Sequence, residues 1–74
     1  MENEDNKIVK ILYINWKGEL NWRTIIPEVI EFKSTQWHPE EQWLLHALDL
    51  DKQEYRDFAM KDIKEWRVGE IDEV

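Results

Sequence analysis

Cysteine is absent from this chain of 74 residues, which also contains only two glycines and one serine. The absence of cysteine excludes disulfides, thiolate metal sites and cysteine nucleophiles. Gly18 and Gly69 stand far apart, so the sequence has no glycine-rich loop of the kind that holds phosphate. A triad built on Ser34 would need an oxyanion hole, and nothing in the sequence suggests one. We therefore expect no catalytic residues, no cofactor and no enzymatic activity.

Long apolar runs are missing as well. The longest run, residues 11–14, is far shorter than the roughly 20 residues of a membrane-spanning helix. Residues 1–5 are acidic, whereas a signal peptide begins with a basic segment. The length leaves room for one domain. These observations predict a single cytoplasmic domain without a membrane partner.

Basic residues are too few to balance the acidic ones. Ten Lys and Arg against 17 Asp and Glu give a formal net charge of −7. Residues 1–37 carry six acids and five bases, whereas residues 38–74 carry eleven acids and five bases. An acidic surface repels phosphate backbones, so this composition disfavours a general polyanion binder.

Tryptophan, in contrast, is abundant for so short a chain. The five tryptophans are Trp16, Trp22, Trp37, Trp43 and Trp66. Because a large aromatic side chain buries about 150–250 Å², we predict that most of them pack in the core. Trp16 in a turn and Trp37 in a long loop are harder to place there. For these two we predict an exposed interaction surface.

The chain divides into a central domain and two tails. Residues 1–6 and 69–74 are polar and acidic and are predicted to be flexible, which leaves residues 7–68 as one domain. Lys7–Asn15 is rich in β-branched and aromatic residues and is predicted to form a strand. A turn over residues 16–19 then provides Gly18 for a positive φ angle.

A second extended stretch covers residues 20–33. Simple alternation puts one set of side chains on one side of it: Trp22, Thr24, Ile26, Glu28, Ile30 and Phe32. Pro27 has no N–H for a ladder hydrogen bond, so we expect a break, a bulge or an edge there.

The second half of the chain is ambiguous from its pattern alone. Pro39 with its neighbouring acids is typical of a helix start, and Leu44, Leu48 and Tyr55 recur at helical spacing. The alternation over residues 43–50 equally fits a strand, with a hairpin turn near residues 51–54. Periodicity does not decide between the two for short apolar runs.

The order of motifs along the chain resembles that of the WYL domain, a family found mostly in bacterial transcriptional regulators. The motifs are, in order, Ile11-Leu12-Tyr13, Gly18, Arg23-x-Ile25-x-Pro27, Trp43-Leu44-Leu45-x-Ala47-x-Asp49 and Arg56-x-Phe58-x-Met60-x-x-Ile63. The resemblance implies a mainly β fold, a small and strongly bent five-stranded barrel of the SH3-like or Sm-like kind. It places the triplet at residues 43–45 on a strand and not on a helix.

The resemblance also implies a function in transcription regulation, as a module that senses a nucleotide or single-stranded nucleic acid. Arg23 and Arg56 match the family's basic positions and would hold phosphate, because a guanidinium binds phosphate with two hydrogen bonds. Tyr13 and Trp43 match aromatic positions and would stack on a base or shape the pocket.

Two departures from the family pattern weigh against that function. Leu44 replaces the tyrosine of the triplet, and Asp62 stands where the family usually has arginine. The alternative is a protein–protein interaction or self-assembly module that uses the acidic surface together with Trp16 and Trp37.

The sequence does not predict a metal site. His38 and His46 are the only histidines, and their spacing does not force them together. The pattern at Asp49 and Asp51 resembles the opening of an EF-hand loop, but Glu54 occupies the position of the required glycine.

Overall fold

The computed structural model describes residues 7–68 of the chain. The tails predicted over residues 1–6 and 69–74 lie outside the described residues. Residues 7–68 contain no helix with the length and apolar character that a membrane crossing requires.

The described residues form a mainly β structure, which confirms the predicted fold class. The strands are β1 (Val9–Ile14), β2 (Leu20–Lys33), β3 (Gln42–Asp49), β4 (Glu54–Ala59) and β5 (Ile63–Val68), and a short 3-10 helix, η2 (Met60–Asp62), connects β4 to β5. The helical interpretation of the second half is therefore wrong. The main chain of β3 and β4 forms its hydrogen bonds with neighbouring strands. Local periodicity does not reveal such pairing between distant residues.

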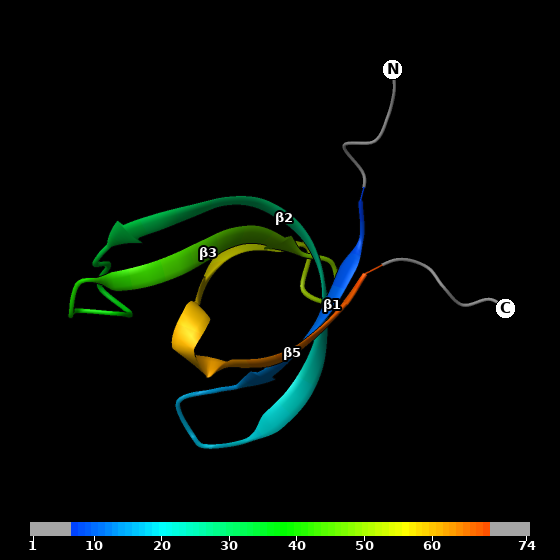
Figure 1. The fold of residues 1–74 in the computed structure, drawn as a ribbon, viewed down its shortest axis with the longest axis horizontal. Helices are drawn as coiled ribbons and strands as arrows, with labels where there is room; N and C mark the ends of the chain where they lie inside the picture. The colour runs from blue at the N-terminus through cyan, green and yellow to red at the C-terminus, as the bar shows by residue number, and fades with distance from the viewer. Residues whose placement is uncertain (1–6, 69–74) are drawn as a thin grey trace, which may run out of the picture.

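The five strands make one antiparallel sheet in the order β4-β3-β2-β1-β5. The long strand β2 pairs with β1 through its first half and with β3 through its second half, and Ile25 belongs to both ladders. Figure 1 shows β2 bending through the middle of the sheet. Within residues 7–68 the two edge strands, β4 and β5, are joined by η2 and not by a ladder.

A β-bulge interrupts β2 between Pro27 and Val29, which confirms the irregularity predicted from the proline. Pro27 pairs with Ala47, whereas Ile30 pairs with Leu45. Since both partners point into the sheet's concave face, the extra residue moves the inward positions of β2 from odd to even numbers. The simple alternation expected over residues 20–33 is therefore wrong beyond the bulge.

The core lies on the concave face and is small. Its residues are Val9, Ile11, Tyr13, Ile25, Leu45, Ala47 and Phe58, with Met60 and Ile63 packed against them. The Tyr13 and Phe58 rings meet edge to face with centroids 5.0 Å apart, a favourable aromatic geometry.

The prediction that most tryptophans pack in this core is wrong, since all five are 41–89% exposed. Trp16 and Trp37 lie in connections between strands. Trp22 pairs with Leu12 on the outer face. Trp43 lies near the start of β3, where it pairs with Phe32, and Trp66 lies on edge strand β5, where it pairs with Ile11. Aliphatic residues and two smaller rings already fill the centre of the concave face, so the indoles lie around it.

Candidate functional site

Arg23 on β2 and Arg56 on β4 converge on the concave face, around the carboxylate of Asp49 at the end of β3. The distances from Asp49 Oδ2 are 3.6 Å to Nη1 of Arg23 and 3.8 Å to Nη1 of Arg56. The register explains this convergence, because Asp49 pairs with Ile25, two residues after Arg23, and Arg56 pairs with Ala47, two residues before Asp49. We call these three residues the arginine–aspartate cluster.

Asp49 also stabilises the turn between β3 and β4 through hydrogen bonds. Its side chain is completely buried, and its Oδ1 accepts the main-chain N–H groups of Asp51 at 3.0 Å and Lys52 at 3.3 Å. The Asp49 carbonyl also accepts the N–H of Gln53 at 2.7 Å. One carboxylate oxygen therefore holds the turn, while the other faces the two guanidinium groups.

The three residues of the cluster together carry a net charge of +1, because two cations face one anion. Among the described residues, Nε of Arg23 and Oδ2 of Asp49 are buried and have no hydrogen-bond partner. The Arg56 side chain is 35% exposed and lies over the Phe58 ring, 5.5 Å from its centroid. Arg56 is thus a held but accessible guanidinium, suited to an anionic group entering from the concave side.

Tyr13 lies beside the cluster but beneath the surface. It is buried, and its hydroxyl accepts the N–H of Ala59 at 3.2 Å. Burial raises the pKa of Tyr13, the Ala59 hydrogen bond opposes that rise, and Asp62 adds to it, while both arginines of the cluster lower the pKa. The structure thus brings three of the four predicted ligand-binding residues together. A stacking role for Tyr13 stays a prediction.

Trp43 is separated from the cluster. It stands four residues before Ala47, the partner of Arg56, and six before Asp49, which corresponds to roughly 13–20 Å along a strand. Trp43 and the arginine–aspartate cluster therefore occupy different places along β3.

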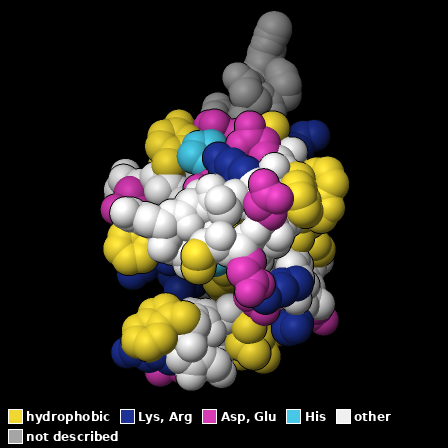
Figure 2. All heavy atoms as spheres, turned by 90° about the vertical axis from the view of Figure 1, so that its left-hand side faces the viewer, with side chains coloured by type: hydrophobic (Ala, Val, Ile, Leu, Met, Phe, Trp, Pro, Cys, Tyr) yellow, Lys and Arg dark blue, Asp and Glu magenta, His cyan; other side chains and the backbone are white. Residues whose placement is uncertain are grey.

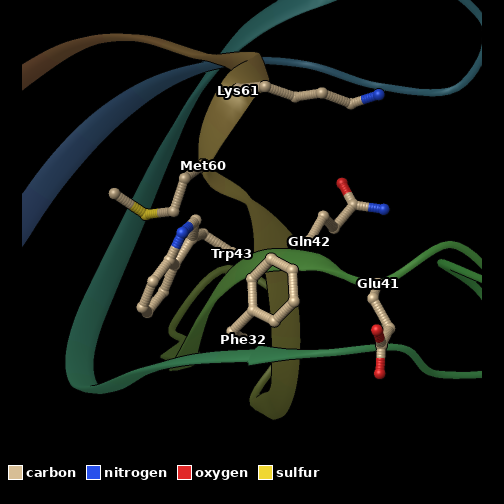
Figure 3. A pocket seen from close by; sticks show the side chains of 6 residues that line it. All are labelled: Phe32, Glu41, Gln42, Trp43, Met60 and Lys61. Atoms are coloured by element: carbon tan, nitrogen blue, oxygen red, sulfur yellow. The ribbon is translucent and has the colours of Figure 1, made fainter.

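Trp43 lines a hollow of about 350 Å³ at the open end of the bent sheet. The residues that line this aromatic hollow are Phe32, Glu41, Gln42, Trp43, Met60 and Lys61. Figure 3 shows the Met60 side chain reaching toward the Trp43 ring, with Phe32 beside it. The Phe32 and Trp43 rings meet at 5.4 Å with an interplanar angle of 63°, so the two rings form a connected apolar surface.

Both histidines make contacts that hold strands and loops in place. Nδ1 of His46 lies 2.9 Å from Oδ1 of Asp57, and the His46 ring stacks on Tyr55. Nε2 of His38 donates to the main-chain carbonyl of Asp57 at 3.1 Å and so ties the loop before β3 to edge strand β4. In residues 7–68, no group of three or more His, Asp or Glu side chains is arranged to hold a metal ion.

The two tryptophans predicted as an interaction surface are the most exposed ones. Trp16 is 89% exposed and Trp37 is 79% exposed. Figure 2, which faces the loop side of the molecule, shows hydrophobic side chains in separate groups between charged ones. The support for an interaction surface is therefore the residue type and not a continuous apolar patch, because tryptophan is enriched among the residues that dominate protein interfaces.

Sequence reasoning missed Asp49 as the centre of the cluster, and it missed Phe32 and Met60 in the aromatic hollow. A signal for Asp49 exists, because Leu45, Ala47 and Asp49 alternate along β3 and so share one face. The hollow has no comparable signal, since it depends on the bulge in β2 and on the position of η2.

Comparison with known proteins does not identify a family. No protein-family model matches the chain, and no curated protein matches it. The resemblance to WYL domains therefore rests on the order of motifs alone and stays a prediction.

Proposed function

We propose that this chain is a non-enzymatic regulatory module that binds a nucleotide or single-stranded nucleic acid at the arginine–aspartate cluster. The observation that supports the proposal is the convergence of Arg23 and Arg56 within 4 Å of one buried carboxylate. The regulatory setting follows from the resemblance to WYL domains.

The cluster is suited to phosphate because the charge of Asp49 keeps both guanidinium groups close together, at 3.6 and 3.8 Å from its Oδ2, before a ligand arrives. A pre-ordered group loses less conformational entropy on binding, which improves affinity. The remaining charge of +1 is small against a chain net charge of −7, so we expect weak binding that requires low salt. For a single strand, the slope of log K against log salt is roughly −0.7 for each phosphate neutralised, and one or two phosphates are expected here.

The experiment is a titration of nucleotides and short oligonucleotides at low salt, followed by tryptophan fluorescence and by heteronuclear NMR. We expect Arg56→Gln to weaken binding about tenfold or more, since a hydrogen bond to a charged group contributes roughly 1.5–3 kcal/mol. Arg67→Gln is the matched control, because Arg67 carries the same charge and lies over Trp22, 5.2 Å from its ring centroid, on the outer face.

Two results would refute the proposal. One is the absence of any spectral response up to millimolar ligand. The other is an equal loss of affinity in Arg56→Gln and Arg67→Gln, which would show that only the overall charge matters.

A second candidate function is protein interaction or self-assembly, favoured by the exposure of Trp16 and Trp37. Exposed tryptophans frequently dominate the binding energy of protein interfaces. The acidic surface would then favour a partner that presents basic groups.

A further inference from the structure

Trp16 is held as a projecting knob on the turn between β1 and β2. Oδ1 of Asn15 accepts the main-chain N–H groups of Lys17 and Glu19, each at 2.9 Å. The N–H of Gly18 also donates to the Asn15 carbonyl at 2.8 Å. This bonded turn fixes the backbone beneath an indole that is almost fully exposed, so little entropy is lost when the ring is bound.

A positive charge accompanies the knob. Nζ of Lys17 lies 5.4 Å from the centroid of the Trp16 ring, a geometry in which a cation is attracted to the ring face. A surface that receives this indole is therefore expected to be apolar in its centre and to present an acidic group opposite Lys17 at its margin.

The aromatic hollow meets both requirements. Phe32, Trp43 and Met60 supply the apolar part, and Glu41 lies at the margin, as Figure 3 shows. Glu40 precedes Glu41 in the sequence, and Lys61 is the one base among the lining residues. The hollow of about 350 Å³ is large enough for an indole ring.

We propose that Trp16 of one copy of this chain inserts into the aromatic hollow of a second copy, with Lys17 beside Glu41. The proposal deepens the second candidate function and rests on it, because it names the partner as the chain itself. Trp37 is the weaker candidate for the knob, since no Lys or Arg adjoins it in the sequence, whereas Lys17 directly follows Trp16.

Knob and hollow are different surfaces of the same chain, so the contact is heterologous and repeats from one copy to the next. The contact area is also small. One indole and the side chains around it bury far less than the roughly 1,200 Å² of a stable interface. The association is therefore weak, and its extent depends on concentration.

The test is sedimentation velocity of the full chain from micromolar to millimolar concentration. The average mass of the wild type is expected to rise with concentration. Trp16→Ala and Trp43→Ala are each expected to weaken association about tenfold or more, the effect of losing a tryptophan hot spot. Trp22→Ala is the control, because it removes a partly exposed indole from the outer face and leaves association unchanged. Trp37→Ala separates the two exposed loop indoles and is expected to weaken association less than Trp16→Ala.

Mixing Trp16→Ala with Trp43→Ala tests the contact most directly. Trp43→Ala still presents the knob and Trp16→Ala still presents the hollow, so an equimolar mixture forms complexes of two chains and no larger species. A charge exchange checks the same contact without touching the apolar groups. Lys17→Glu and Glu41→Lys each weaken association, and the double variant restores it. Far-ultraviolet circular dichroism confirms that every variant is folded.

The proposal is overturned if the wild type stays monomeric, if Trp37→Ala weakens association as much as Trp16→Ala, or if the mixed variants do not associate. It is also overturned if Trp43→Ala changes oligonucleotide affinity and leaves the mass distribution unchanged, which would assign the hollow to the nucleic-acid ligand. Arg56→Gln separates the two functions, since it is expected to reduce ligand binding and not self-association.

Discussion

Replacing Asp49 by asparagine tests whether the arginine–aspartate cluster holds the sheet together. The amide oxygen can still accept the N–H groups of Asp51 and Lys52, so the turn is preserved. The two guanidinium groups, however, lose their counter-ion and repel each other. At these separations one ion pair contributes about 4 kcal/mol of Coulomb energy near a protein surface, but desolvation of the buried carboxylate offsets much of it.

Removing one partner of a buried pair typically costs about 3–5 kcal/mol. Arg56 is one-third exposed and can turn toward water, which lowers the expected loss for Asp49→Asn to about 2–4 kcal/mol. A domain of this size has a free energy of unfolding of roughly 4–11 kcal/mol, so the variant loses a large share of it. Urea denaturation followed by circular dichroism measures the loss.

The matched control is Asp57→Asn, which removes a partly exposed pair with His46 and is expected to cost about 0–1 kcal/mol. A double-mutant cycle adds a second criterion. Arg56→Gln should cost less in the Asp49→Asn background than in the wild type, because it then relieves repulsion. If Asp49→Asn unfolds within about 0.5 kcal/mol of the wild type, the cluster has no structural role and the reasoning is refuted.

Three further predictions concern the core and the first turn. Phe58→Ala is expected to lower the free energy of unfolding by about 3–5 kcal/mol in urea, because the ring packs on Tyr13 and beneath Arg56; a loss below about 1 kcal/mol would show that the ring lies outside the core. Gly18→Ala should cost about 1 kcal/mol, since a Cβ there meets nothing within 4 Å and only the φ angle of 83° opposes it; an unchanged urea midpoint contradicts this. Because burial raises the pKa of Tyr13, the unfolded chain ionises first, so stability is complete below pH about 10 and falls as the pH rises further. Tyrosinate absorbance and circular dichroism should change together for Tyr13, and ionisation of both tyrosines in a folded chain would disprove the burial argument.

The sequence predicted the strands of the first half because their residues have strong β preferences. It also located the irregularity at Pro27, since the missing N–H is a property of the residue itself. What followed from the irregularity was not predictable. A one-residue bulge exchanges the two faces of a strand, so Ile30 and Phe32 point to the concave side although Ile26 does not.

The candidate site was predicted in part for a similar reason. Arg23 and Arg56 belong to strands that are not neighbours in the sheet, and only the register with β3 brings them to the same carboxylate. Alternation along β3 places Asp49 on the buried face, but it does not reveal which cations compensate it. Trp43 was expected near the arginines, and its distance along the strand follows directly from its position six residues before Asp49.

The ladder between β1 and β5 has a consequence for how the chain folds and opens. It joins Val9 to Val68 and Tyr13 to Ile63, sequence separations of 68 − 9 = 59 and 63 − 13 = 50 residues. Closing so large a loop costs more entropy than forming any of the three hairpins, β1–β2, β2–β3 and β3–β4. We therefore expect β5 to dock last during folding and to detach first under native conditions, which exposes the side of β1 that it covers. Amide hydrogens shared by β1 and β5 should exchange fastest among those of the four ladders.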